Sequence, residues 1–230
     1  MENYFNYEKI KRGLKNLKDR RNIPLLVWLI IFLVLFWLIG LFSIPGHYKI
    51  IKPGSDGQVS QYLTNHILPE LYNKSQYNQP FDLVVSEDGI NDIIARQIDS
   101  NSLQRSGFSN LSVTFKRGRI LLTGRTVYHG FSFVVTIVLK PYINKEGYFC
   151  PKVSKVQAGT SRIPFVAETM KRRVLYRLAG LSKDSGTADF VGMLFNSGKI
   201  EPVFSFNHRK LRIEKITVQN KQLTIQFLPE

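Results

Sequence analysis

The longest apolar stretch lies near the start of the chain, between Ile23 and Tyr48, and contains no Asp, Glu, Lys or Arg. A helix made from its central 20 residues, 25–44, spans about 30 Å, which is enough to cross the hydrocarbon core of a bilayer. We expect a transmembrane helix over 23–48, with these membrane-anchoring residues: Leu25, Trp28, Trp37 and Ile44. A cleaved signal peptide is the alternative, and it fits poorly because the run is too long and no small-x-small cleavage site follows it.

Beyond this run, apolar residues first recur at helical spacing. The spacing predicts a helix over 58–72, which Pro69 would kink or end, and then a short strand over 81–85. Ser86 is a good N-cap for a further helix ending near Asp99, and Glu87 and Asp88 fall in its first turn, where the helix dipole favours carboxylates.

From residue 109 the period changes to two, because apolar and polar residues alternate. Strands are expected over 109–116, 119–128, 131–139 and 148–158, joined by short turns into a four-stranded antiparallel meander. A helix should begin at Pro164 and end near residue 180, a poorly defined segment follows over 182–200, and a hairpin closes the chain. The fold class is therefore α+β.

Charge sets the expected topology. Residues 1–22 carry a net charge of +4, and basic flanks remain in the cytoplasm, so residues 49–230 are expected outside the cell membrane as one extracytoplasmic domain. That domain carries +11 of the total charge of +15. In the cytoplasm such an excess of basic residues would suggest binding to nucleic acid. Outside the cytoplasm it suggests binding to anionic lipid headgroups or to anionic envelope polymers. The alternative is that the charge only keeps the domain soluble.

Motifs for catalysis or metal binding are missing from the sequence. The four histidines are far apart, Cys150 is the only cysteine, and no nucleophile elbow or phosphate-binding loop occurs. The adjacent carboxylates Glu87 and Asp88 are explained better by the helix dipole than by catalysis. We therefore expect a non-enzymatic protein without a cofactor.

The order of strands and turns resembles a known family. The matching pieces are the apolar run, 85–91 opening a helix, the 113–124 hairpin, 133–142, the turn at Gly147, 156–159, 163–164 and the closing hairpin 213–227. In this order of strands and turns, the chain resembles the YpmS-type membrane-anchored extracytoplasmic proteins and, more distantly, the LmeA-like envelope lipid-binding proteins. The resemblance implies a curved antiparallel sheet packed around amphipathic helices, similar to a half-module of tubular lipid-binding proteins, whose concave face can hold acyl chains.

The leading hypothesis is therefore a single-pass protein that binds a membrane lipid or another amphiphile. The candidate apolar groove comprises Phe131, Phe133, Val135, Ile137, Met170 and Val174, and the candidate anionic headgroup contacts are Arg162, Lys171, Arg172 and Arg173. These basic residues also suit a solvated helix face. The rival hypothesis is an interaction subunit of an envelope protein assembly, and binding of an anionic envelope polymer is a weaker third.

Overall fold

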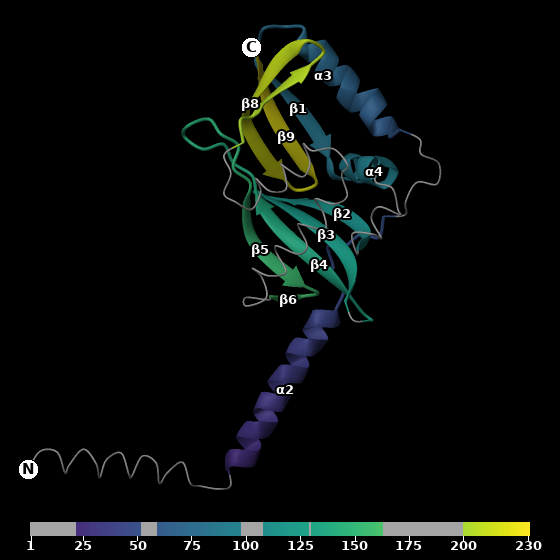
Figure 1. Cartoon of the computed structure of the whole chain (residues 1–230), viewed down its shortest axis with the longest axis vertical. Helices are drawn as coiled ribbons and strands as arrows, with labels where there is room; N and C mark the ends of the chain where they lie inside the picture. Colours follow the sequence, from purple (N-terminus) through teal and green to yellow (C-terminus); the bar gives the residue numbers. More distant parts are fainter. Residues whose placement is uncertain (1–21, 52–58, 98–107, 129, 163–199) are drawn as a thin grey trace, which may run out of the picture. The chain divides into compact units, whose positions relative to one another are not determined.

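The computed structural model describes residues 22–51, 59–97, 108–128, 130–162 and 200–230 (Figure 1). The chain divides into two compact units, residues 1–41 and 42–230. Helix α2 (Asn22–Phe42) belongs to the first unit except for Phe42. Its part Pro24–Phe42 is long and apolar enough to cross a membrane, and Leu25, Trp28 and Trp37 on it are exposed. The helix ends before Ile44, so residues 43–48 are not helical.

A four-stranded antiparallel sheet forms one half of the second unit (Figure 1). Its strands, in spatial order, are β1 (Phe81–Ser86), β9 (Gln222–Pro229), β8 (Arg209–Gln219) and β7 (Val203–Phe206). The π-helical segment η1 (Leu63–Ile67) and helix α3 (Leu68–Ser75) supply Ile67 and Leu71 to a core cluster with Leu83, Leu211 and Phe227 of this sheet.

A five-stranded antiparallel sheet forms the other half, and each strand pairs with the next one along the chain. The strands are β2 (Phe108–Lys116), β3 (Arg119–Tyr128), β4 (Phe131–Lys140), β5 (Lys152–Ala158) and β6 (Ser161–Arg162). Phe108, Val135, Ile137, Leu139 and Val156 form the buried cluster of this sheet.

Helix α4 (Glu87–Gln97) joins the two sheets. Ile90 and Ile94 of this helix pack against a cluster of Val113, Phe115 and Val218, which come from both sheets. The turns also meet, because the Gly118 amide donates to the Val218 carbonyl at 2.9 Å and the Lys221 amide donates to the Phe115 carbonyl at 3.1 Å. The two halves therefore share a core.

Several predicted elements are confirmed. The strands of the central hairpins and of the closing hairpin lie where the alternation predicts them, and Ser86 caps α4, since its Oγ accepts the Gly89 amide at 3.0 Å. Helix α4 is described as far as Gln97; the predicted end near Asp99 and the helix expected from Pro164 lie outside the described residues.

Other features differ from the expectation or go beyond it. Strands β2, β3, β4 and β5 are successive neighbours in one sheet, as predicted, but β1, β9, β8 and β7 form a second sheet that the sequence pattern did not indicate, and the pattern did not reveal β7 at all. Strand β5 begins at Lys152 and not at Tyr148, since Pro151 has no amide to pair in a sheet. The helix expected to end or kink at Pro69 continues to Ser75, and the turn before Pro69 is π-helical, with the Leu68 amide bonded to the Leu63 carbonyl.

Candidate functional site

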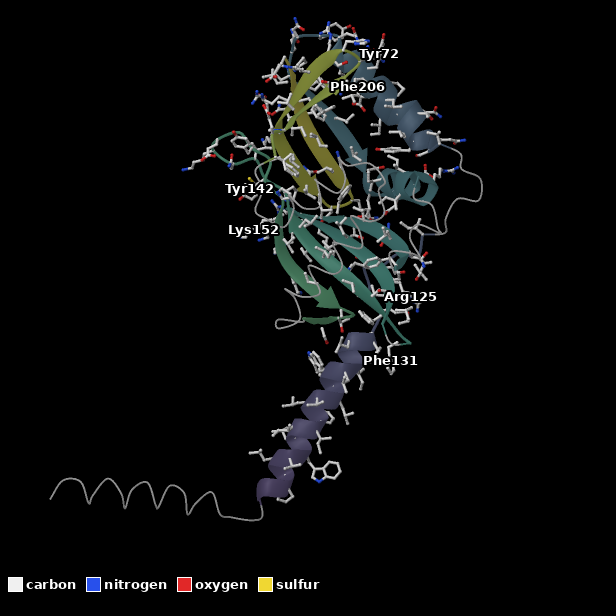
Figure 2. All side chains as sticks on the ribbon, in the orientation of Figure 1. Tyr72, Arg125, Phe131, Tyr142, Lys152 and Phe206 are labelled. Carbon is white, nitrogen blue, oxygen red and sulfur yellow. The ribbon has the colours of Figure 1, made fainter. Side chains whose placement is uncertain are left out.

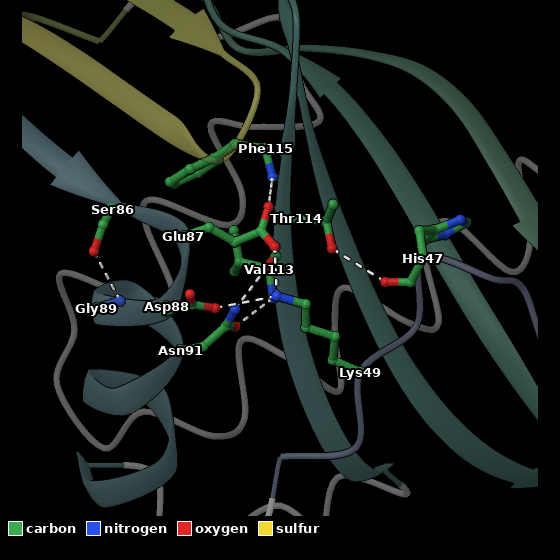
Figure 3. A network of polar contacts seen from close by, with 10 residues as sticks. All are labelled: His47, Lys49, Ser86, Glu87, Asp88, Gly89, Asn91, Val113, Thr114 and Phe115. Carbon is green, nitrogen blue, oxygen red and sulfur yellow. Dashed lines mark hydrogen bonds and ion pairs between the residues drawn. The ribbon is translucent and has the colours of Figure 1, made fainter.

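The first polar cluster lies where α4 meets the outer edge of β2 (Figure 3). Glu87 is only 3 % exposed, and its Oε2 accepts the Phe115 backbone amide at 2.8 Å. Asn91, one turn further on, bonds both backbone groups of Val113, accepting its amide at 2.7 Å and donating to its carbonyl at 2.8 Å. Side chains of α4 thus satisfy an edge strand that would otherwise expose unpaired backbone groups.

Lys49 supplies the positive charge of this cluster. Its Nζ lies 2.8 Å from Glu87 Oε1 and 3.1 Å from Asp88 Oδ1, and these two hydrogen bonds raise the pKa of Lys49. The Glu87 carboxylate is therefore held by a backbone amide and by Lys49, and the Asp88 carboxylate is held by Lys49. These contacts have a structural role, because they connect the segment after α2 to the start of α4.

A second polar cluster covers one face of the five-stranded sheet. Ser112, Thr123 and Thr136 lie in register across β2, β3 and β4 and are all at most 2 % exposed. The segment after α2 lies on them, because His47 Nε2 is 3.1 Å from Thr136 Oγ1 and the His47 carbonyl accepts the Thr114 hydroxyl at 3.2 Å. Thr123 and Thr136 also contact each other, with 3.4 Å between their hydroxyl oxygens.

Three buried polar side-chain atoms of the second unit have no hydrogen-bond partner. They are the hydroxyl oxygens of Tyr48 and Ser112 and the Nε of Arg125, and no other buried side-chain nitrogen or oxygen of the described residues is in this condition. Burial raises the pKa of Tyr48, while the charge of Arg125 and the side chain of Asn110 act to lower it. Buried polar groups are normally paired with protein atoms or ordered water, so these three atoms are exceptions among the described residues.

His47 shares this electropositive environment. Burial lowers the pKa of His47 below its usual value, and the charges of Lys116 and Lys155 lower it further. The charges that shift the pKa values of His47 and Tyr48 therefore all come from basic side chains. Such a cluster offers hydrogen-bond donors and positive charge, and it is suited to an acceptor.

Apolar side chains are exposed at the end of the β3–β4 hairpin (Figure 2). Val127 is 54 % exposed and Phe131 is 63 % exposed, and Arg125 lies two residues before Val127 on β3. The Phe131 ring is 5.9 Å from that of Phe42, which ends α2 and begins the second unit. Ile44, just beyond, is 60 % exposed.

The structure distributes the predicted site residues over several environments. Val135 and Ile137 are buried, at 3 % and 4 % exposed, Phe133 packs against the same cluster, and Phe131 is exposed. Arg162 ends β6 and pairs with Gln157 through the backbone. The remaining predicted residues lie outside the described ranges: Met170, Val174, Lys171, Arg172 and Arg173.

Sequence reasoning did not identify Tyr48, Ser112 or Arg125. Ser112 alternates with apolar residues along its strand, and nothing local indicated that the segment after the apolar helix would cover its face of the sheet. The one available signal was the row of hydroxyl residues at matching strand positions, Ser112, Thr123 and Thr136.

Comparison with protein-family models, with curated proteins and with solved structures finds no match. The resemblance to YpmS-type proteins therefore stays a prediction. Among the described residues, no group of three or more His, Cys, Asp or Glu side chains is placed to hold a metal ion.

Proposed function

We propose that this chain is a non-enzymatic, single-pass membrane protein whose domain after α2 lies outside the cytoplasm and binds a membrane lipid or a similar amphiphile. In this proposal α2 is an uncleaved anchor and the basic N-terminal segment is cytoplasmic. The exposure of the apolar side chains of α2 supports a membrane environment, because the core helix of a soluble protein buries such side chains.

The observation that carries the proposal is the apolar end of the β3–β4 hairpin. Phe131 is exposed and lies against Phe42, the residue at which the apolar helix ends. Exposed apolar residues beside the end of a membrane-spanning helix favour contact with lipid. Removing their apolar surface from water contributes about 25 cal/mol of binding free energy per Å². Arg125 and Tyr48 stand next to this apolar end, as expected at the headgroup level, where Tyr is enriched.

The finer architecture belongs to the same proposal. The five-stranded sheet would be the curved meander of the YpmS-type resemblance, packed around amphipathic helices, and the helix predicted from Pro164 would add Met170 and Val174 to the apolar face. Its basic residues Lys171–Arg173 would add charge near an anionic surface, at about 1 kcal/mol for each residue.

The test is crosslinking of the full chain in its membrane to a phospholipid that carries a photoactivatable group in its acyl chain. Any transmembrane helix is crosslinked along α2, so the informative products are peptides from β3 and β4, above all those containing Phe131 or Phe133. Phe131→Ser should lower the yield on β4 several-fold, while Tyr142→Ser, a change at an exposed aromatic on the β4–β5 connection, should not. Crosslinks confined to α2 would contradict lipid binding and favour an interaction subunit.

A further inference from the structure

We infer that a row of basic side chains across the five-stranded sheet binds a linear, phosphate-rich polyanion. The row has one member on each of four neighbouring strands, and we call it the basic row: Lys116, Arg119, Lys140 and Lys152. All of them belong to the second unit. The location of the polymer outside the cytoplasm rests on the proposed function, whereas binding of the polymer to the row does not.

Strand pairing puts the four side chains in line. Lys116 is directly opposite Arg119, and Lys140 is directly opposite Lys152. Arg119 and Lys140 continue the antiparallel register between β3 and β4 at its end. Residues directly opposite each other in antiparallel strands point to the same face, with Cβ atoms about 5 Å apart. The charges therefore form one row about 14 Å long, since neighbouring strands are about 4.8 Å apart.

The sheet supplies no counter-charge to the basic row. The five strands β2 to β6 contain no Asp or Glu. All four side chains of the row are exposed, and none forms a hydrogen bond or an ion pair in the part of the chain that the structure describes. Like charges directly opposite each other destabilise a sheet, so the row lowers stability unless an anion lies against it.

The basic row is the exposed margin of an electropositive face. Lys116 is two residues beyond Thr114 and points to the same face, and the Thr114 hydroxyl donates to the His47 carbonyl at 3.2 Å. Lys155 is opposite Val138, which shares this face, because it lies two residues before the row on β4. The charges of Lys116 and Lys155 both lower the pKa of His47, as expected for lysines on one face.

The basic row lies far from the apolar end of the β3–β4 hairpin. The ten residues of β4 run from Phe131 to Lys140, which is about 30 Å of extended chain. Figure 2 shows Lys152 and Phe131 at opposite ends of this sheet. Phe131 contacts Phe42 at the end of α2, and the headgroup layer of one leaflet is only about 5–8 Å thick. The row therefore suits a partner that extends away from the membrane.

A linear polyanion matches both the shape and the chemistry of the row. Phosphate binds lysine as a point charge and arginine through paired N–H donors, so both residue types in the row suit it. One free phosphate contacts only neighbouring members of the row, whereas a chain of phosphates along the row neutralises all of them. The row has no aromatic member to stack on bases, which single-stranded nucleic acids require for tight binding.

The first experiment measures binding of long-chain inorganic polyphosphate, labelled at one end, to the full chain in dodecyl maltoside by fluorescence anisotropy. The test variant combines Arg119→Gln with Lys140→Gln and removes the two central charges of the row. The control combines Lys210→Gln with Lys215→Gln, at exposed positions on β8, so that both variants have the same total charge.

The test variant should bind polyphosphate at least about tenfold more weakly than the unmodified chain, and the control less than about twofold. The slope of log affinity against log salt should become shallower by about 1.4 in the test variant, at about 0.7 for each lost phosphate contact. The basic N-terminal segment is common to all three proteins, so its contribution cancels in the comparison.

Thermal unfolding shows whether the test variant is folded. Without polymer it should melt at a higher temperature than the unmodified chain, because the substitutions remove repulsion along the row. Polyphosphate should raise the melting temperature of the unmodified chain more than that of the test variant, since only tight binding to the folded state stabilises it. A lower melting temperature without polymer would contradict the repulsion on which the inference depends.

Equal binding by the test variant and the control would overturn the basic row and leave only the total charge of the chain. Competition by orthophosphate at equal phosphate concentration, or stronger competition by a single-stranded oligonucleotide of equal charge, would overturn the assignment to a phosphate polymer. In nanodiscs, a difference between the two variants that disappears with phosphatidylglycerol but not with phosphatidylcholine would assign the row to headgroups instead. Lipid crosslinking at Phe131 should be unchanged in the test variant, so the two proposals fail separately.

Discussion

At the residue scale, Glu87 determines how the edge of β2 is closed. Its carboxylate accepts a backbone amide inside the protein and also pairs with a half-exposed lysine. The exposed pair contributes little, whereas the bond to the buried Phe115 amide is difficult to replace.

We therefore expect Glu87→Ala to lower the free energy of unfolding by about 3 kcal/mol, because it leaves the Phe115 amide unpaired. Glu87→Gln should cost only about 1 kcal/mol, since an amide oxygen can still accept that bond. Urea titration of the full chain in detergent measures both. Asp88→Asn is the matched control and should change stability by less than about 0.5 kcal/mol, since Asp88 is exposed. Equal losses for Gln and Ala would show that the ion pair with Lys49 matters more than the backbone bond.

His47 makes stability depend on pH. Its pKa in the folded protein is lowered, so below the unfolded value of about 6.5 the unfolded chain binds more protons than the folded one. Stability should therefore fall as the pH decreases from about 7 toward 5.5, before most carboxylates titrate. In His47→Gln this part of the decrease should disappear.

The control for this pH series is His208→Asn, at an exposed turn position with a φ of 64° that asparagine tolerates. It should retain the slope of the unmodified chain. Thermal unfolding followed by circular dichroism across this pH range measures all three proteins, and an unchanged slope in His47→Gln would contradict the assignment.

Residue-scale features were predictable where they are local. Ser86 follows a strand and precedes a helix, and its capping bond to Gly89 is the one that the sequence indicated. Glu87 was placed correctly at the helix start, but its role in closing β2 depends on Phe115, 28 positions away. The contact between His47 and Thr136, 89 positions apart, is likewise one that no local pattern encodes.

At the element scale, Gly89 allows α4 to pack under the ring of Tyr62. A Cβ added at Gly89 would lie 2.2 Å from Tyr62 Cε1, which is impossible without movement, and the Tyr62 hydroxyl also accepts the Ser86 amide at 2.8 Å. A glycine in a helix normally costs about 1 kcal/mol relative to alanine, so the ordinary effect of Gly→Ala is reversed here.

Gly89→Ala should therefore destabilise the protein by about 2 kcal/mol or more through overpacking. In a Tyr62→Ala background the same change should be neutral or stabilising, because the clashing ring is gone, and this non-additivity is the signature to measure in a double-mutant cycle. Gly46→Ala is the control, since an added Cβ there meets nothing within 4 Å. Additive effects of the two substitutions would contradict the packing explanation.

Elements built from neighbouring residues were the predictable ones. The β2–β3 and β8–β9 hairpins follow from alternation and short turns, including the positive φ of Gly118 and Lys221. The pairing of β1 with β9 was not predictable, because it joins Phe81 to Phe227 across most of the chain. The π-helical turn before Pro69 was also missed, since the sequence shows the missing amide but not how the helix adapts to it.

At the scale of the whole molecule, the division into two sheets comes from α4 and the meeting of two turns. Alternation predicts strands but does not determine which strands share a sheet. The apolar run and the basic N-terminal segment, by contrast, are whole-chain features that the sequence states directly. For this reason the long apolar helix was easier to predict than the polar clusters that follow it.

The last prediction concerns the proposed topology, in which the preference of Lys and Arg for the cytoplasm keeps the basic N-terminal segment inside. Cys150 is the only cysteine, so Cys150→Ser gives a background for labelling. With a membrane-impermeant maleimide on spheroplasts, Lys145→Cys, at an exposed position between β4 and β5, should be labelled directly, and Lys15→Cys only after permeabilisation.

A cleaved signal peptide gives a different result. Residue 15 would then be missing from the mature chain, so Lys15→Cys would give no labelled product under any condition and the mass of the protein would fall accordingly. Labelling of Lys15→Cys on intact spheroplasts would instead reverse the orientation. Cleavage would remove the membrane anchor and still leave the sheets outside the cytoplasm, whereas a reversed orientation would place them inside it. Either result would contradict the proposed single-pass protein with an anchored domain outside the cytoplasm.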